Sequence, residues 1–185
     1  MDDLKTLILL LGCAANLLLI AGILWSIFQP ERRVWPPERS TATHKTIVWG
    51  MTCLGFGSTI ILGFLEWGAF DFHWAIRWGL GFGLIVLGNA VVWSAVMQLG
   101  MGATSGDDGV LRSGGLYLFS RNPQYVADIA ILIGIGLFSA SILAWPVICT
   151  GIAALVLAVF AEERWLIDRF GDAYRNYLHT TRRFL

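Results

Sequence analysis

Charged side chains are scarce in this sequence. Asp, Glu, Lys and Arg make up 14% of its 185 residues, whereas a typical soluble domain contains about 25%. The 13 basic and 13 acidic residues cancel, so no basic excess is available to bind nucleic acid. Hydrophobic residues make up 56% of the chain. The composition therefore predicts a membrane protein without a nucleic-acid partner.

Residues that bind metals are few and scattered. Each of the three cysteines lies within an apolar run, without CxxC spacing or a nearby histidine. The three histidines lie far apart, in loops or in the tail. We interpret the cysteines as small buried hydrophobic residues rather than metal ligands or disulfide partners. The sequence therefore predicts no metal site.

Long apolar runs, in contrast, are abundant. A helix needs about 20 apolar residues to cross roughly 30 Å of hydrocarbon. Five runs come close to this length or exceed it: Thr6–Phe28, Thr46–Leu65, Ile76–Leu99, Gln124–Ala140 and Ile142–Phe160. We predict an all-α, polytopic membrane protein with five transmembrane helices, folded as a single membrane domain over residues 1–185.

Basic residues are distributed unevenly about these five runs. When they are assigned to alternate sides, 11 of the 13 share the side of the carboxyl terminus, and only Lys5 and Arg77 lie on the other. Basic loops are retained in the cytoplasm. We therefore predict an inner-membrane protein with its amino terminus outside and its carboxyl terminus in the cytoplasm.

The amino-terminal half has features that we interpret as structural. Gly79 and Gly83 share one helix face and predict close helix packing, and Asn89 is expected to hydrogen-bond a neighbouring helix. The loop over residues 28–45 contains three prolines and Trp35. We interpret it as a topology anchor on the membrane surface rather than as a contact for a headgroup or substrate.

The last two runs are joined around Ser139–Ser141 with almost no connector, which predicts a helical hairpin. The hairpin must bring the start of the fourth run, "SRNPQYVADI", beside Glu162 and Glu163 at the end of the fifth. Pro123 suits the first position of a helix, where its missing N–H has no cost. Two polar clusters that are distant in sequence are therefore expected to form one site.

This site is expected to hold opposite charges. A helix amino terminus and Arg121 favour an anion, whereas Glu162 and Glu163 favour a cation. Asp128, one turn into the fourth run, must be paired or face water, and Arg121 or the tail is its expected partner. Ring faces for a cation are offered by Tyr125, Tyr174 and Tyr177.

The tail after residue 160 is predicted to form an amphipathic cytoplasmic segment, bent or weakened at Gly171, that folds against the membrane face or over the site. Its apolar residues recur at the spacing of one helical face. They are Leu166, Phe170, Ala173, Tyr174 and Tyr177.

Two stretches, "LYLFSRNPQYVADI" and "EERWLIDRFGDAYRNYLHTTRRF", together resemble the carboxyl-terminal signature of integral-membrane methyltransferases, the isoprenylcysteine carboxyl methyltransferase and phospholipid methyltransferase group. The resemblance covers roughly residues 110–185. It implies S-adenosylmethionine as cofactor and a lipid or otherwise lipophilic acceptor, whether carboxylate, amine or thiol. It also implies a scaffold over residues 1–99 and a cofactor-binding catalytic part over 100–185. Asn122 stands where the family commonly has His.

The resemblance also implies roles for individual residues. Glu162 and Glu163 are expected to hold the amino end of the cofactor, and Arg121 and Asn122 its polar groups. The expected catalytic residues are Arg121, Glu162 and Glu163. The expected cofactor-binding residues are Leu116, Tyr117, Arg121, Asn122, Pro123, Tyr125, Glu162 and Glu163. The expected substrate-binding residues are Asp128, Tyr174 and Tyr177.

Other interpretations stay open at this stage. The Glu pair and Arg121 could be ordinary charges at a membrane boundary. The hairpin and tail also resemble the NADPH-dependent membrane sterol reductases, and a non-catalytic packing protein is a third possibility. The sequence predicts no oligomeric state.

Overall fold

The computed structural model describes residues 2–37, 41–104 and 110–185, apart from the side chains of residues 101 and 103. These ranges contain helices and no strand. The elements are α1 (Asp2–Phe28), η1 (Pro30–Arg32), α2 (Ala42–Leu65), η2 (Ala75–Gly81), α3 (Phe82–Leu99), α4 (Met101–Thr104), η3 (Gly115–Leu118), α5 (Pro123–Ser139), α6 (Ala144–Phe170) and α7 (Asp172–Thr180).

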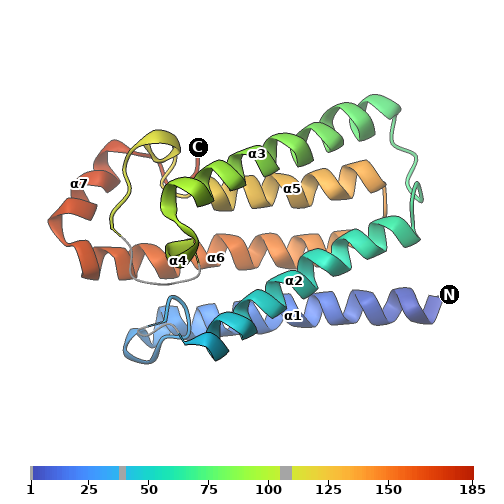
Figure 1. Ribbon diagram of the computed structural model, residues 1–185. Coiled ribbons are helices and arrows are strands. Elements are labelled where there is room, and N and C mark those ends of the chain that lie inside the picture. The colour runs from blue at the N-terminus through green and yellow to red at the C-terminus, as the bar shows by residue number, and fades with distance from the viewer. Residues whose placement is uncertain (1, 38–40, 105–109) are drawn as a thin grey trace.

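The long helices form a bundle in which α1 and α2 pack on each other and on α6, while α3 packs on α5 (Figure 1). A buried core lies where α2, α5 and α6 meet, around Leu62, Leu132, Val147 and Ile148. The amino terminus and the turn between α5 and α6 lie at one end of the bundle. The loops that precede α2 and α5 lie at the other end, with α7 and the carboxyl terminus.

Within the described ranges, four helical segments are long and apolar enough to cross a membrane: α1, α2, η2 together with α3, and α6. The fifth predicted span, α5, is apolar and has 17 residues, about 25 Å at 1.5 Å per residue. The chain is thus a multi-pass helical membrane protein, and the count of five crossings stays a prediction. α6 continues to Phe170 instead of ending at Phe160 as predicted, because residues 161–170 contain neither glycine nor proline.

The turn between α5 and α6 is held by two charged side chains. The Glu66 carboxylate accepts hydrogen bonds from the Ser141 hydroxyl at 2.6 Å and from the Leu143 N–H at 2.7 Å, at the start of α6. Burial alone raises the pKa of Glu66, but these hydrogen bonds bring it below its ordinary value. Arg77 donates to the Phe138 carbonyl at 3.1 Å, at the end of α5. Each charge thus lies at the helix end that carries the opposite partial charge. This interaction stabilises the turn of the predicted hairpin.

The contact between α3 and α5 depends on glycines, but not on the predicted pair. A Cβ atom at Gly81 would lie 2.7 Å from the Phe138 backbone nitrogen, and one at Gly88 would also meet α5 below 3 Å. Nothing lies within 4 Å of the corresponding position at Gly79 or Gly83. The predicted packing at Gly79 and Gly83 therefore does not occur within this chain. Residues 75–81 form a π-helix, and its last residue, Gly81, lies against α5.

The polar residues within the bundle also differ from expectation. Asn89 is exposed and donates to the Ile85 carbonyl of its own helix at 2.8 Å, so the predicted bond to a neighbouring helix is wrong. Asn16 makes such a bond instead. Its amide is buried in α1 and donates to the Val147 carbonyl at 3.0 Å and to the Thr150 hydroxyl at 3.1 Å, both in α6.

The tail is amphipathic, as predicted, but it comprises two helices. Gly171 adopts a φ of 54°, a conformation that favours glycine, and separates the end of α6 from α7. The change of direction leaves Ala173 exposed, contrary to its predicted place on the apolar face. The other four residues of that face lie in one cluster with Tyr117: Leu166, Phe170, Tyr174 and Tyr177.

Candidate active site

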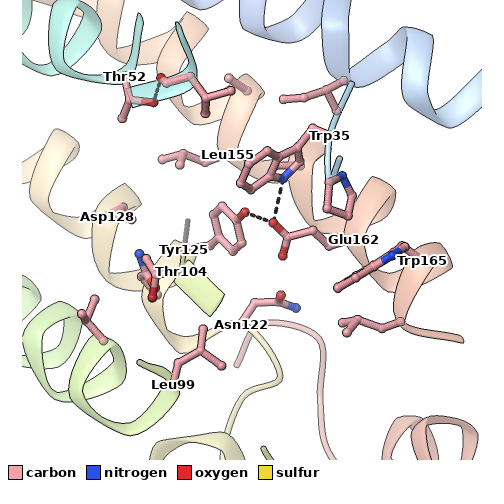
Figure 2. Close-up of a pocket in the computed structure, with 18 of the residues that line it drawn as sticks. Trp35, Thr52, Leu99, Thr104, Asn122, Tyr125, Asp128, Leu155, Glu162 and Trp165 are labelled. Carbon is pink, nitrogen blue, oxygen red and sulfur yellow. Dashed lines mark hydrogen bonds between the residues drawn. The ribbon is translucent and has the colours of Figure 1, made fainter. Parts of the chain in front are cut away.

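A cavity of about 590 Å³ lies at the end of the bundle that carries α7. Its polar end is formed by the α1–α2 loop, the start of α5, the end of α6 and α7, as Figure 2 shows in part. Trp35, Asn122, Tyr125, Asp128 and Glu162 all line this end. The cavity continues between apolar side chains of α1, α2, α3 and α6. It therefore combines a polar pocket with an apolar arm.

Glu162 contributes the acidic group of the polar end. Trp35 Nε1 donates to Glu162 Oε1 at 2.7 Å, and the Tyr125 hydroxyl donates to the same oxygen. Figure 2 shows both bonds converging on one oxygen while the second points away from them. No residue in the described ranges donates to Oε2. One carboxylate oxygen is thus fixed, and the other is free to accept a hydrogen bond from a ligand.

Glu163 has a different environment, although it is the next residue. Successive residues of a helix point about 100° apart, and Glu163 does not line the cavity. Its carboxylate accepts from Arg121 Nη2 at 2.8 Å and from Arg183 Nη2 at 2.8 Å. The side chain is only 7% exposed. The structure therefore separates the predicted Glu pair into a cavity residue and a buried ion-pair residue.

Arg121 lines the cavity, but most of its hydrogen-bonding capacity is already used. Its Nε and Nη2 donate to Glu163, and its Nη1 donates to the carbonyls of Leu178 at 3.1 Å and Thr181 at 2.7 Å. These four bonds occupy four of the five N–H groups of a guanidinium. Arg121 therefore joins α6, the carboxyl-terminal tail and the start of α5.

Asn122 and Pro123 form the start of α5 as predicted, with Pro123 in its first turn. Asn122 is buried, and its side-chain amide donates to the Arg183 carbonyl at 3.0 Å. The first N–H groups of a helix have no partner within it, and this turn of α5 lines the cavity. The start of α5 thus offers the same cavity a patch that favours an anion.

The aromatic wall is formed by Tyr117, Tyr174 and Tyr177, which pack together and line the cavity. The Tyr177 hydroxyl donates to the Tyr117 carbonyl, which fastens α7 to the loop before α5. Burial raises the pKa of Tyr177 to about 12. Burial, reinforced by the negative charge of Glu162, raises the pKa of Tyr117 to about 12. Leu116, in contrast, does not line the cavity; its N–H donates to Gln98 Oε1 at 3.1 Å.

Asp128 lies one turn after Tyr125 on α5 and lines the cavity (Figure 2). The expected pairing with Arg121 or the tail is wrong, because Arg121 is engaged by Glu163 and by two carbonyls. Within the described part of the chain, Asp128 has no hydrogen bond or ion pair. An acid without a protein partner, at the side of a mostly apolar cavity, is placed to meet a ligand.

Trp35 was not among the predicted site residues. Its loop was interpreted as a topology anchor, yet its indole N–H holds Glu162 and its ring lines the cavity. The only signal in the sequence was an aromatic residue in a proline-rich loop on the same side as the site. Which partner that residue meets depends on how α1 packs on α6, and the sequence pattern does not specify this.

One comparison with known proteins gives the family of this chain. The family model described as phospholipid methyltransferase matches residues 76–173, which is more than half of the chain. The chain belongs to the phospholipid methyltransferase family. Membership implies methyltransferase activity at a membrane and disfavours the reductase alternative. No match was found among curated proteins or among solved structures. Trp35 and Arg183 lie outside the segment that the phospholipid methyltransferase model covers.

Proposed function

We propose that this protein transfers a methyl group from S-adenosylmethionine to the amine of a membrane lipid, at the cytoplasmic face of the inner membrane. The observation that supports this most is the free oxygen of Glu162. It projects into a cavity that also contains an anion-favouring helix start and an unpaired Asp128. The orientation rests on the concentration of basic residues at this end of the bundle.

The residues present fit the cofactor. Glu162 Oε2 is proposed to accept from its ammonium, and the first turn of α5 to receive its carboxylate. The aromatic wall offers ring faces to cationic groups. We propose that Arg121 and Glu163, expected from the sequence to contact the cofactor, act as positioning residues, because each is bound mainly to other protein groups.

When bound, the cofactor supplies a methyl group on a positively charged sulfur, which leaves as a neutral thioether. The protein has to align the acceptor with that carbon and exclude water. Asp128 favours an amine acceptor, because its carboxylate attracts an ammonium and repels a carboxylate. We propose that Asp128 takes the proton of the ammonium, so that the nitrogen lone pair can form the new N–C bond while the C–S bond breaks.

The apolar arm supports a lipid acceptor. Met51, Phe56 and Leu155 line it. Ile47 on α2 and Trp93 on α3 also line the cavity, although they are 51% and 61% exposed. The cavity therefore opens sideways between α2 and α3. A lipid is proposed to enter there from the bilayer, with its amine toward Asp128 and its chains in the arm.

Two measurements test this proposal. S-adenosylhomocysteine should raise the melting temperature of the purified protein, because a ligand that binds the folded state stabilises it, and NADPH should not. Tritiated methyl groups from labelled cofactor should then appear in an amine-containing phospholipid from a total-lipid extract. Stabilisation by NADPH alone would favour the reductase, and stabilisation by neither compound would favour the packing protein.

The role of Asp128 is tested separately. Asp128→Asn should retain binding of S-adenosylhomocysteine but lose most methyl transfer, since general base catalysis contributes about 10² to 10⁴ in rate. Asp128→Glu, which keeps a carboxylate at this position, is the control and should transfer more methyl groups than Asp128→Asn. Full transfer by Asp128→Asn would exclude this residue as the proton acceptor.

A further inference from the structure

The α1–α2 loop is fastened to three elements, and Trp35 lies at its centre. The backbone N–H groups of Val34 and Trp35 both donate to the buried Ser26 hydroxyl of α1, at 2.8 and 2.9 Å. The His44 ring, at the start of α2, stacks on the Trp35 ring with centroids 6.2 Å apart and planes inclined by 10°. The indole is thus held in place by α1 and α2 in addition to its contact with α6.

The indole N–H decides which Glu162 oxygen is available. Both Trp35, in the α1–α2 loop, and Tyr125, on α5, donate to Oε1. Two bonds to one oxygen fix the rotation of the carboxylate, and so fix the direction of Oε2. Without the indole bond, only the bond from Tyr125 would restrict rotation of the carboxylate about the Cγ–Cδ bond of Glu162. The free oxygen would then have no single orientation.

We propose that Trp35 is a positioning residue of the active site, which orients the Glu162 carboxylate so that its second oxygen meets the ammonium of the cofactor. This inference rests on the proposed function. It adds a residue that precedes the segment 76–173, which the family model matches. The amino-terminal helices then do more than support the catalytic half, because their connecting loop completes the cofactor site.

The test compares S-adenosylhomocysteine affinities by titration calorimetry. Trp35→Phe keeps an aromatic ring but removes the N–H, and it should weaken binding about tenfold, as expected for one hydrogen bond to a charged group. Trp25→Phe is the matched control. It removes an indole bond of 3.1 Å to the Arg32 carbonyl in the same loop, away from the cavity, and should leave affinity unchanged.

A double-mutant cycle shows whether Trp35 acts through Glu162. In a Glu162→Gln background, Trp35→Phe should cause less than about a twofold further loss, because the charge that Trp35 orients is absent. Equal losses in both backgrounds would overturn the proposal and leave Trp35 as a wall of the cavity. So would an unchanged affinity of Trp35→Phe.

If Trp35→Phe fails to fold, benzothienylalanine at position 35 replaces the N–H by sulfur at nearly constant shape. It should give the same tenfold loss, and normal affinity would overturn the proposal. A wild-type protein that does not bind S-adenosylhomocysteine contradicts the proposed function itself. A wild-type protein that binds it, together with an unaffected Trp35 variant, contradicts only the inference about Trp35.

Discussion

Glu162 and Glu163 are adjacent, yet the structure predicts opposite consequences for the same substitution. Glu163→Gln leaves the Arg121 guanidinium, whose side chain is 8% exposed, without its counter-charge. Breaking a buried ion pair from one side costs about 3 to 5 kcal/mol. We expect a value near 3, because the amide oxygen still accepts one bond. The Arg183 pair, on a side chain that is 40% exposed, adds less than about 1 kcal/mol.

A loss of this size lowers the melting temperature by roughly 6 to 12 °C in a chain of this length. Glu162→Gln should behave differently, because the bonds from Trp35 and Tyr125 are made by neutral donors that an amide oxygen also accepts. Its melting temperature should stay within roughly 2 °C of wild type. Its affinity for S-adenosylhomocysteine should fall about 10- to 100-fold, the range for a hydrogen bond to a charged group.

The assay is a thermal melt in detergent that is monitored by intrinsic fluorescence. It is carried out with and without S-adenosylhomocysteine. Each variant is the control for the other, since both remove one charge from neighbouring positions of one helix. Equal melting temperatures for the two variants would refute the separation into a cavity residue and an ion-pair residue. So would a Glu163→Gln protein that is stable but unable to bind the ligand.

Gly81→Ala should lower the melting temperature, because the new methyl group would meet the backbone of α5 at 2.7 Å, whereas Gly79→Ala, with nothing within 4 Å, should not. The pKa values of Tyr117 and Tyr177, raised by burial to about 12, predict that phenolate absorbance appears well above the usual pH of about 10. Their contribution to stability is present below about pH 10 and is lost as the pH rises toward 12. Thermal melts at increasing pH measure this loss. A phenol titration near pH 10 without unfolding would contradict the prediction. Glu66→Ala should destabilise the protein by about 0.5 to 2 kcal/mol through loss of the hydrogen bonds at the start of α6. Because the pKa of Glu66 is lowered, its contribution to stability is present above about pH 4.5 and should disappear as the pH falls through the folded-state pKa. If the stability of wild type and of Glu66→Ala depends equally on acid pH, this prediction is wrong.

The sequence predicted the elements whose signals are local. Apolar length defined the helices, and Pro123 marked the start of α5, because a residue without an N–H is favoured there. The hairpin followed from the short connector. The proximity of Arg121 and Glu163 was also predicted correctly, because the two residues lie at similar distances along the chain from the turn of an antiparallel hairpin.

The remaining features depend on rotation about helix axes, which a single sequence constrains weakly. Whether Glu162 or Glu163 faces the cavity depends on a turn of about 100°. The glycines that pack on α5 are Gly81 and Gly88, which share one helix face, and not Gly79 and Gly83, which face elsewhere. Trp35 was missed for a related reason: its contact with α6 joins positions separated by 127 residues, and no periodic pattern links them.

The length of α6 has a consequence for where the reaction takes place. Glu162 lies 18 residues after Ala144, where α6 begins, and this corresponds to about 27 Å of helix. That rise nearly equals the hydrocarbon thickness of roughly 30 Å. If α6 begins at one boundary of the hydrocarbon, the carboxylate lies at the depth of the polar headgroups at the other boundary. A lipid headgroup already lies at this level, so an acceptor would be modified without being lifted out of its leaflet.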